Sequence, residues 1–301
     1  MGIIEQLLRI NKKQKLWYYL PFSLFFLGIM FLNWISLKYS SVSTNEIIKI
    51  NIQKYGKNIN FLITIGPLVF MLIFLIVWVL FVHKQSLLSL TTSRTKVDWR
   101  RFIFSFTLWS FIIIGFFIYG YIVSPEDYVF SFKLGPFVVF LLFAIILIPL
   151  QTSFEEYFMR GYLMQGIGLA TRSRAVALFS TSIIFGLMHL ANPEVEKIGA
   201  SIMIYYIGTG LFLGIITLMD DGLELALGFH AANNLIGVLL VTSDWTAFQT
   251  NSLFTNINSE SVISPWEYII QVGIVLPIVI IIFSKKYGWK NWKHQLFGKV
   301  V

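Results

Sequence analysis

Three short groups of polar residues interrupt the apolar second half of this chain, and their residue types suit the hydrolysis of an amide. They are Glu155-Glu156 with Arg160, then His189, then His230 with Asn234. Ionisable groups placed in long apolar runs are costly and usually mark a working site. We therefore expect the chemistry of this protein within residues 155–234.

The spacing of the first group separates two carboxylates with different surroundings. On a helix, Glu156 and Arg160 are four residues apart and share a face, so they can pair and neutralise each other. Glu155 points about 100° away and has no obvious partner, which makes it the candidate general base. The alternative is an ordinary salt bridge at a helix end.

The two histidines follow a similar spacing rule. Phe185 and His189 share a helix face, and so do His230 and Asn234. Glu155 and His189 lie equally far from the turn near Arg172, which predicts one depth for both in an antiparallel hairpin, roughly 25 Å from that turn. His230 is expected nearer the end of its own helix, at about 12 Å of rise, so it needs a tilted or recessed helix to join them.

Together these residues form the parts of a hydrolytic site. A water between Glu155 and His189 can be activated for attack, and His230 with Asn234 can stabilise the oxyanion. Packed or interfacial histidines and polar helix contacts are the alternatives for each group taken alone. Asn233 is turned about 100° from the His230 face and is set aside.

The composition predicts an all-α, polytopic membrane helix bundle. The chain has 301 residues, of which 56% are hydrophobic and 13% charged, with a mean hydropathy of +0.75; soluble domains carry about 25% charged residues. Apolar windows long enough to span a bilayer predict about eight transmembrane helices, at roughly 17–37, 61–82, 102–123, 136–168, 174–191, 200–219, 223–242 and 266–284. The absence of cysteine excludes disulfides and thiolate chemistry.

The charges predict the topology. Most of the 23 lysines and arginines fall on the side of the two termini, including Arg9, Lys12, Lys13 and Lys15, which predicts a multi-pass cell-membrane protein with both termini cytoplasmic. The net charge of +8 is thus a topology signal with attraction to anionic lipid, and nucleic acid is not an expected partner. We expect N-terminal helices over 1–134, a catalytic core over 135–242, and an outer loop, last helix and basic tail over 243–301.

Three motifs resemble those of a known family. The segments EEYFMR at 155–160, FGLMH at 185–189 and HAANN at 230–234 are similar to the EExxxR, FxxxH and HxxxN motifs of the CPBP intramembrane proteases. That family groups type II CAAX prenyl endopeptidases with bacteriocin-processing and abortive-infection (Abi) membrane proteins, and the resemblance covers roughly 135–240. It implies a glutamate-dependent endopeptidase with an all-helical core and a site open to the cytoplasmic side.

The resemblance also implies residue roles. Glu155 and His189 would prepare the water, and His230 and Asn234 would serve the oxyanion. Glu156 and Arg160 would support Glu155. The family is often labelled metalloprotease, so a zinc site of Glu155, His189 and His230 stays open, although no HExxH is present and a metal-free mechanism is favoured.

The expected partners are the lipid bilayer and a membrane-associated peptide or protein substrate. Two other functions fit the same residues. One is a non-catalytic membrane immunity or scaffolding protein that binds a peptide or membrane partner. The other is a proton-coupled transporter, which the lack of evident inverted repeats disfavours.

Overall fold

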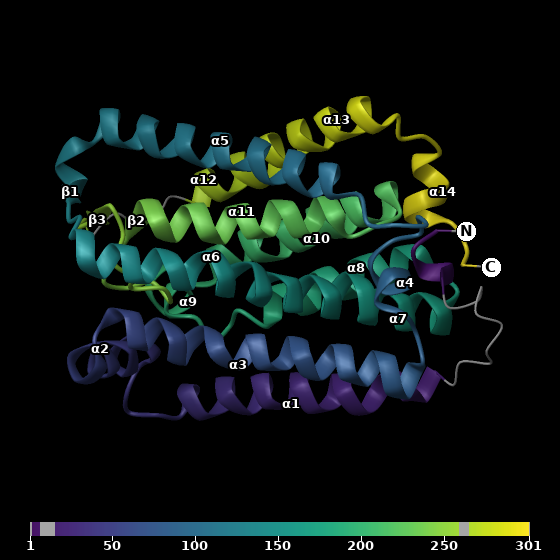
Figure 1. The fold of residues 1–301 in the computed structure, drawn as a ribbon, viewed down its shortest axis with the longest axis horizontal. Helices are drawn as coiled ribbons and strands as arrows, with labels where there is room; N and C mark the ends of the chain where they lie inside the picture. The colour runs from purple at the N-terminus through teal and green to yellow at the C-terminus, as the bar shows by residue number, and fades with distance from the viewer. Residues whose placement is uncertain (1, 7–15, 259–264, 301) are drawn as a thin grey trace.

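The computed structural model describes residues 2–6, 16–258 and 265–300, and it is a bundle of long helices that run roughly along one axis (Figure 1). Six of these helices are long and apolar enough to cross a membrane: Tyr19–Lys38, Lys57–His83, Trp99–Val123, Leu134–Thr171, Ala200–Asp220 and Trp266–Tyr287. Two shorter apolar helices, Arg174–Leu187 and Glu224–Leu240, complete the set. The predicted all-α membrane bundle is confirmed, and each of the eight expected spans corresponds to one of these helices.

The secondary structure is helical apart from three short strands. The α-helices are α1 (Tyr19–Lys38), α2 (Thr44–Tyr55), α3 (Lys57–Trp78), α4 (Leu87–Thr91), α5 (Trp99–Val123), α6 (Leu134–Glu156), α7 (Met164–Thr171), α8 (Arg174–Leu187), α9 (Pro193–Ile198), α10 (Met203–Asp220), α11 (Glu224–Leu240), α12 (Pro265–Ile270), α13 (Leu276–Tyr287) and α14 (Trp292–Phe297). The strands are β1 (Tyr128–Phe130), β2 (Val241–Thr242) and β3 (Phe254–Asn256), in the order β1-β3-β2. Strand β3 pairs antiparallel with β1 and parallel with β2.

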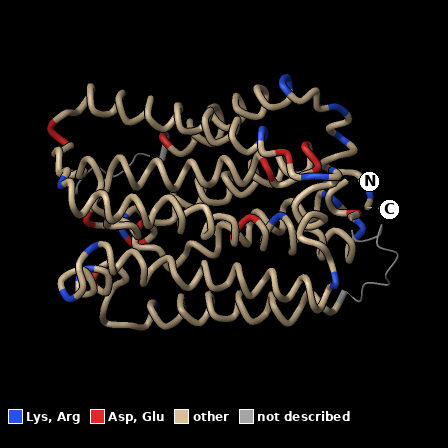
Figure 2. Tube along the Cα trace, viewed as in Figure 1, with Lys and Arg blue, Asp and Glu red and all other residues tan. Residues whose placement is uncertain are grey.

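Both chain ends lie at one end of the bundle, which we call the terminal end (Figure 1). The opposite, distal end holds α2 and the three strands. Lysine and arginine gather mainly toward the terminal end (Figure 2), as the predicted topology requires. The basic residues expected before the first span, Arg9, Lys12, Lys13 and Lys15, lie outside the described residues.

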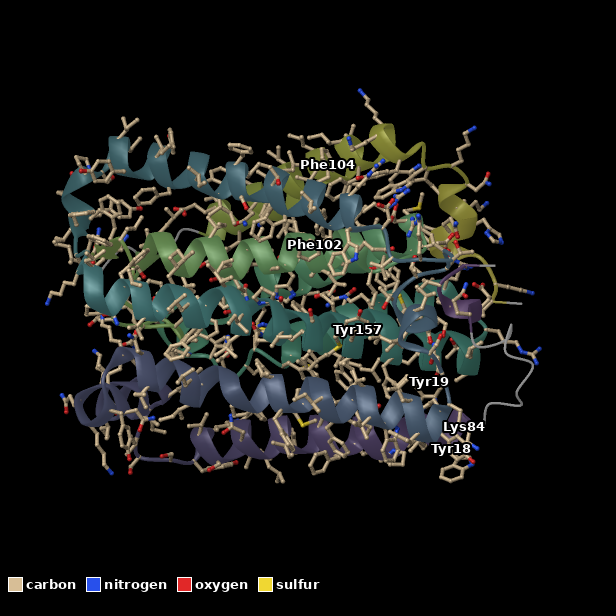
Figure 3. The ribbon with its side chains drawn as sticks, viewed as in Figure 1. Tyr18, Tyr19, Lys84, Phe102, Phe104 and Tyr157 are labelled. Carbon is tan, nitrogen blue, oxygen red and sulfur yellow. The ribbon has the colours of Figure 1, made fainter. Side chains whose placement is uncertain are left out.

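The centre of the bundle is built on one long helical segment. Helix α6 contains Pro149 and continues through a π-helical stretch, Tyr157–Leu163, into α7. Its neighbours are α3 and α11, and α11 packs in turn on α5. Side chains fill the spaces between these helices (Figure 3); the labelled Tyr157 hydroxyl, for example, lies 2.8 Å from that of Thr91.

Small residues bring α8 and α10 close together. A Cβ at Gly210 would lie 2.9 Å from the Ser182 carbonyl oxygen, so a larger residue would push the two helices apart. This is the close contact that the small residues Gly210 and Gly214 allow. It places the α10 backbone beside the arginine of the long central segment.

Candidate active site

The carboxylate pair ends α6, and the π-helical stretch follows at once. Such π-bulges occur frequently at functional sites. Glu156 and Arg160 are both fully buried. The Arg160 guanidinium donates from Nη1 to Glu156 Oε1 over 3.0 Å and from Nη2 to the Gly210 carbonyl over 3.0 Å. It also lies 4.4 Å over the ring of Phe185, so the predicted ion pair is present and its cation contacts three helical segments.

His230 lies between the two glutamates. Its Nδ1 is 2.7 Å from Glu156 Oε1, and because a carboxylate only accepts, this nitrogen carries the proton and donates it. Its Nε2 lies 3.7 Å from Glu155 Oε2. The expected mismatch in depth does not arise, because α11 begins within the buried core: Glu224 at its first turn is only 1% exposed.

His189 lies just past the end of α8, two residues beyond Leu187. Its Nδ1 is 2.8 Å from the Phe185 carbonyl oxygen, so Nδ1 donates and Nε2 keeps the lone pair in the neutral ring. The imidazole stacks on Tyr206 with centroids 4.3 Å apart. The Phe185 ring contacts both imidazoles, with centroids 4.9 Å from His189 and 5.9 Å from His230.

Two amide side chains that sequence reasoning did not assign complete this group. Gln151 donates from Nε2 to Glu155 Oε1 and accepts from Asn234 Nδ2 over 3.3 Å. Asn234 Oδ1 in turn accepts from Asn233 Nδ2 over 3.1 Å. The amides therefore form a chain of hydrogen bonds that ends on the candidate base. Gln151 was detectable as a polar side chain four residues before Glu155, on the same helix face.

Asn233 was set aside because of its direction, yet its side chain lines the same cavity as His230 and Asn234. Its Oδ1 accepts from the Trp109 indole over 3.1 Å and from the Tyr205 hydroxyl over 3.4 Å. The Asn233 side chain does point away from the His230 face. Its oxygen is held by residues of α5 and α10, and its amide nitrogen donates to Asn234. Asn233 thus holds the side-chain oxygen of Asn234.

A cavity of about 470 Å³ joins these side chains. Four of the six predicted residues line it, namely Glu155, His189, His230 and Asn234. Glu156 and Arg160 lie behind them. In the part of the chain that the structure describes, Glu155 Oε2 is buried and has no hydrogen-bond partner. A buried polar atom of this kind needs an explanation, and beside a cavity it is an acceptor for a bound water or substrate.

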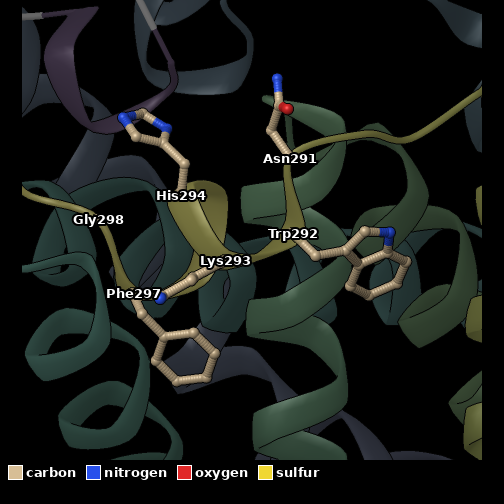
Figure 4. A pocket seen from close by; sticks show the side chains of 6 residues that line it. All are labelled: Asn291, Trp292, Lys293, His294, Phe297 and Gly298. Carbon is tan, nitrogen blue, oxygen red and sulfur yellow. The ribbon is translucent and has the colours of Figure 1, made fainter.

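The remaining two histidines lie elsewhere. His83 is buried near Tyr162, with its Nε2 3.3 Å from the tyrosine hydroxyl. His294 lies on α14 at the terminal end, where it lines a separate cavity together with Trp292 and Phe297 (Figure 4). Neither histidine lines the central cavity. His189 and His230, which the sequence analysis selected, are the histidines that line it together with Glu155.

Glu155, His189 and His230 show one feature of a zinc site and lack another. Both imidazoles donate Nδ1–H to an oxygen, which is the outer-shell pattern of metal-bound histidine. However, within residues 2–6, 16–258 and 265–300 no three His, Cys, Asp or Glu side chains are close enough together to hold a metal ion. The arrangement of Glu155, His189 and His230 therefore does not fit a zinc site, and we derive no step through a metal.

Comparisons with known proteins agree with the three motifs. The family model described as type II CAAX prenyl endopeptidase Rce1-like matches residues 134–236, which contain all three. The chain is 30% identical over 216 residues to the uncharacterized protein YyaK of Bacillus subtilis (strain 168), and the match covers 70% of this chain and 71% of that protein. No solved structure matches the chain.

Proposed function

The chain belongs to the Rce1-like family of type II CAAX prenyl endopeptidases, and we propose that it hydrolyses a peptide bond in a membrane-associated peptide or protein with a water activated by Glu155. The observation that carries the proposal is the buried Oε2 of Glu155, which accepts no hydrogen bond from any described residue and lies beside a cavity that two imidazoles also line. The chain is a multi-pass membrane protein, and from the charge distribution we propose that both termini are cytoplasmic.

In the proposed reaction, the water oxygen attacks the carbonyl carbon of the scissile amide and gives its proton to Glu155 Oε2. His189 Nε2 accepts a hydrogen bond from the same water and orients it. The proton then passes from Glu155 to the leaving nitrogen as the carbon–nitrogen bond breaks. The second proton of the water stays on the new carboxyl group, so the products are a carboxylic acid and an amine, with no covalent enzyme intermediate.

The oxyanion is stabilised by Asn234 and His230. Asn234 donates one of its two amide hydrogens to Gln151, which leaves the other for the oxyanion. His230 donates from Nε2 when its ring carries both protons. The Arg160–Glu156 pair holds the His230 ring through Nδ1, so these two residues act as positioning residues.

The test is a comparison of membrane-bound and secreted peptides from cells that express either wild-type protein or Glu155→Ala. We expect a set of cleavage products that disappears in Glu155→Ala while the variant still accumulates in the membrane. The matched control is Glu126→Ala, which removes an exposed glutamate at the distal end. Identical peptide patterns in wild type and Glu155→Ala would favour a non-catalytic binding protein instead.

A further inference from the structure

We propose that the substrate reaches the catalytic cavity from the distal end, through a groove between the second half of α1 and the segment that joins α8 to α9. This inference rests on the proposed function and adds a binding subsite to it. The occupant is the part of the substrate chain next to the scissile bond. Three features of the structure carry it.

First, the path toward the terminal end is closed. The side chains of Phe154, Phe158, Phe212, Leu213 and Leu225 pack there and are at most 2% exposed. Among the described residues, no member of the terminal-end loops lines the cavity. A peptide cannot enter through this close-packed layer without unfolding it.

Second, the cavity extends toward the distal end, where α1 stands away from the bundle. The buried residues of α1 are Tyr19, Phe22, Ser23 and Phe26, all in its first half. A Cβ at Gly28 would meet nothing within 4 Å. Beyond that point Asn33 lines the cavity from α1, and Asn192 and Phe248 line it from the distal loops.

Third, a second cavity of about 620 Å³ lies next to the first one on its distal side, and Asn192 lines both. Its walls are Trp34 and Leu37 on α1 and Val195 and Glu196 on α9. The Thr44 hydroxyl ties the walls together at the mouth by donating to the Ala191 carbonyl over 3.1 Å.

The lining changes in character along this path. Beside the catalytic residues it includes the apolar side chains of Ile29, Met30 and Leu68. At the mouth it includes Lys38, Ser41, Ser43, Thr44, Glu46 and Glu196. A peptide that fits both parts has apolar residues at the scissile bond and a polar segment leading out of the membrane. The substrate class is therefore a juxtamembrane segment, where a hydrophobic stretch meets a polar one.

This direction also decides between two expectations from the sequence. Cytoplasmic termini and a site open to the cytoplasm cannot both hold, because the cavity opens away from the terminal end. The basic residues gather mainly at the terminal end (Figure 2), which assigns that end to the cytoplasm. The groove then opens on the outer face of the membrane, and the substrate is cleaved near that face.

A labelling experiment tests the path without relying on catalysis. The chain has no cysteine, so each introduced thiol is unique. Ser41→Cys reports the mouth, Asn33→Cys the inner groove and Lys290→Cys the exposed terminal-end tail. A membrane-impermeant maleimide added to intact cells should label the first two, and Lys290→Cys only after permeabilisation. The reverse pattern would overturn the proposal.

Closing the groove provides a second, independent readout. A bis-maleimide that links Leu37→Cys to Val195→Cys bridges opposite walls. Bridging should stop cleavage of the peptide that disappears in Glu155→Ala cells, whereas the same reagent on either single cysteine should not. Cleavage at an unchanged rate through a bridged groove would refute the path. If wild-type protein cleaves nothing, the proposed function fails and the labelling pattern alone decides the path.

Kinetics test the subsite itself. Trp34→Ala should raise KM about tenfold and leave kcat within about twofold, because the side chain binds substrate before and during the reaction equally. The control is Leu32→Ala, on the same helix, 65% exposed and outside both cavities, which should change neither constant. An unchanged KM in Trp34→Ala would remove this residue and its subsite from the account.

Discussion

Among the buried charges that the structure describes, the cluster at the terminal end and the cluster around Glu155 differ in how completely their oxygens are hydrogen-bonded. At the terminal end, Asp220 accepts from Arg94 over 2.9 Å, from Arg101, and from the Trp289 indole over 3.1 Å. Glu224 accepts from Arg94 over 3.2 Å and from a backbone N–H over 3.2 Å. Neither carboxylate has a buried oxygen that lacks a hydrogen-bond partner among the described residues.

The central cluster consists of Glu155, Glu156, Arg160 and His230, and its carboxylates are less completely hydrogen-bonded. Glu155 and Glu156 each keep one buried oxygen without a hydrogen-bond partner in the described part of the chain, and Glu155 lines a cavity. A fully paired network mainly holds helices together, whereas an unpaired buried oxygen costs stability. Burial of charge alone therefore does not mark a site; at Glu155 the unpaired oxygen coincides with a cavity that two imidazoles also line.

The largest difference between the effect on rate and the effect on stability is expected for His189→Ala. The imidazole makes one backbone hydrogen bond and its ring contacts, so its loss should lower kcat by about 10²–10⁴-fold while the melting temperature changes little. Purified protein and the identified peptide provide the assay. His294→Ala, which removes the terminal-end histidine of Figure 4, should retain the wild-type rate, and a fully active His189→Ala would remove His189 from the site.

The opposite outcome is expected at the terminal end. Asp220→Asn removes the charge that pairs with Arg94 and Arg101, whose side chains are 25% and 17% exposed, so partial solvation limits the loss to ~1–3 kcal/mol of stability. The variant should unfold at a lower temperature, and its kcat should stay within about twofold at temperatures where it is folded. A large fall in kcat without a loss of stability would erase the distinction between the two clusters.

A smaller effect on rate is expected for Gln151→Met, which keeps the length of the side chain and removes its hydrogen bonds to Glu155 and Asn234. As a positioning residue, Gln151 should affect kcat by up to about 100-fold and leave KM nearly unchanged. Thr152→Val, one residue away, loses only hydrogen bonds to its own helix and is the control. A rise in KM alone would show that Gln151 contacts substrate rather than Glu155.

Glu194 shows the expected behaviour of a carboxylate that has an unpaired buried oxygen but does not line the catalytic cavity. Glu194, in the distal α9, accepts from the Ala247 N–H over 2.9 Å, and its Oε2 has no hydrogen-bond partner among the described residues. Burial raises the pKa of Glu194 above its ordinary value of 4.5. The folded protein therefore binds the proton of the Glu194 carboxyl group more tightly than the unfolded chain does. The contribution of Glu194 to stability accordingly falls as pH rises through the folded pKa.

Glu194→Gln should therefore raise the melting temperature at pH 7 by at most a few degrees, and it should reduce the gain in stability that wild type shows between pH 7 and pH 5. Thermal unfolding at both pH values measures this difference. The rate of cleavage should not change, since Glu194 does not line the cavity. A lower melting temperature in the variant at pH 7 would show that the buried charge stabilises the fold.

The smallest effect is expected from metal removal. Because the side chains around Glu155 do not fit a zinc site, excess chelator should change kcat by less than about twofold. Cleavage by purified protein before and after dialysis against EDTA is the measurement. Loss of activity that returns with added zinc would replace the proposed water activation by a metal-dependent one.

The sequence predicted the bundle and the meeting of Glu155 with His189 and His230, because apolar windows and ionisable residues in them carry strong signals. It left open how His230 reaches the depth of Glu155, since hydropathy does not reveal that α11 begins inside the core. It missed Gln151 and Asn233 because their roles depend on neighbours from other helices. The direction of the cavity depends on where α1 leaves the bundle, and no local pattern encodes that.

The most direct test of the central claim is the rate of purified Glu155→Gln on the identified peptide. This substitution keeps the size of the side chain and its hydrogen-bonding length but removes the base. We expect kcat/KM to fall by at least about 10³-fold with an unchanged melting temperature. Cleavage by Glu155→Gln at the wild-type rate would contradict the account.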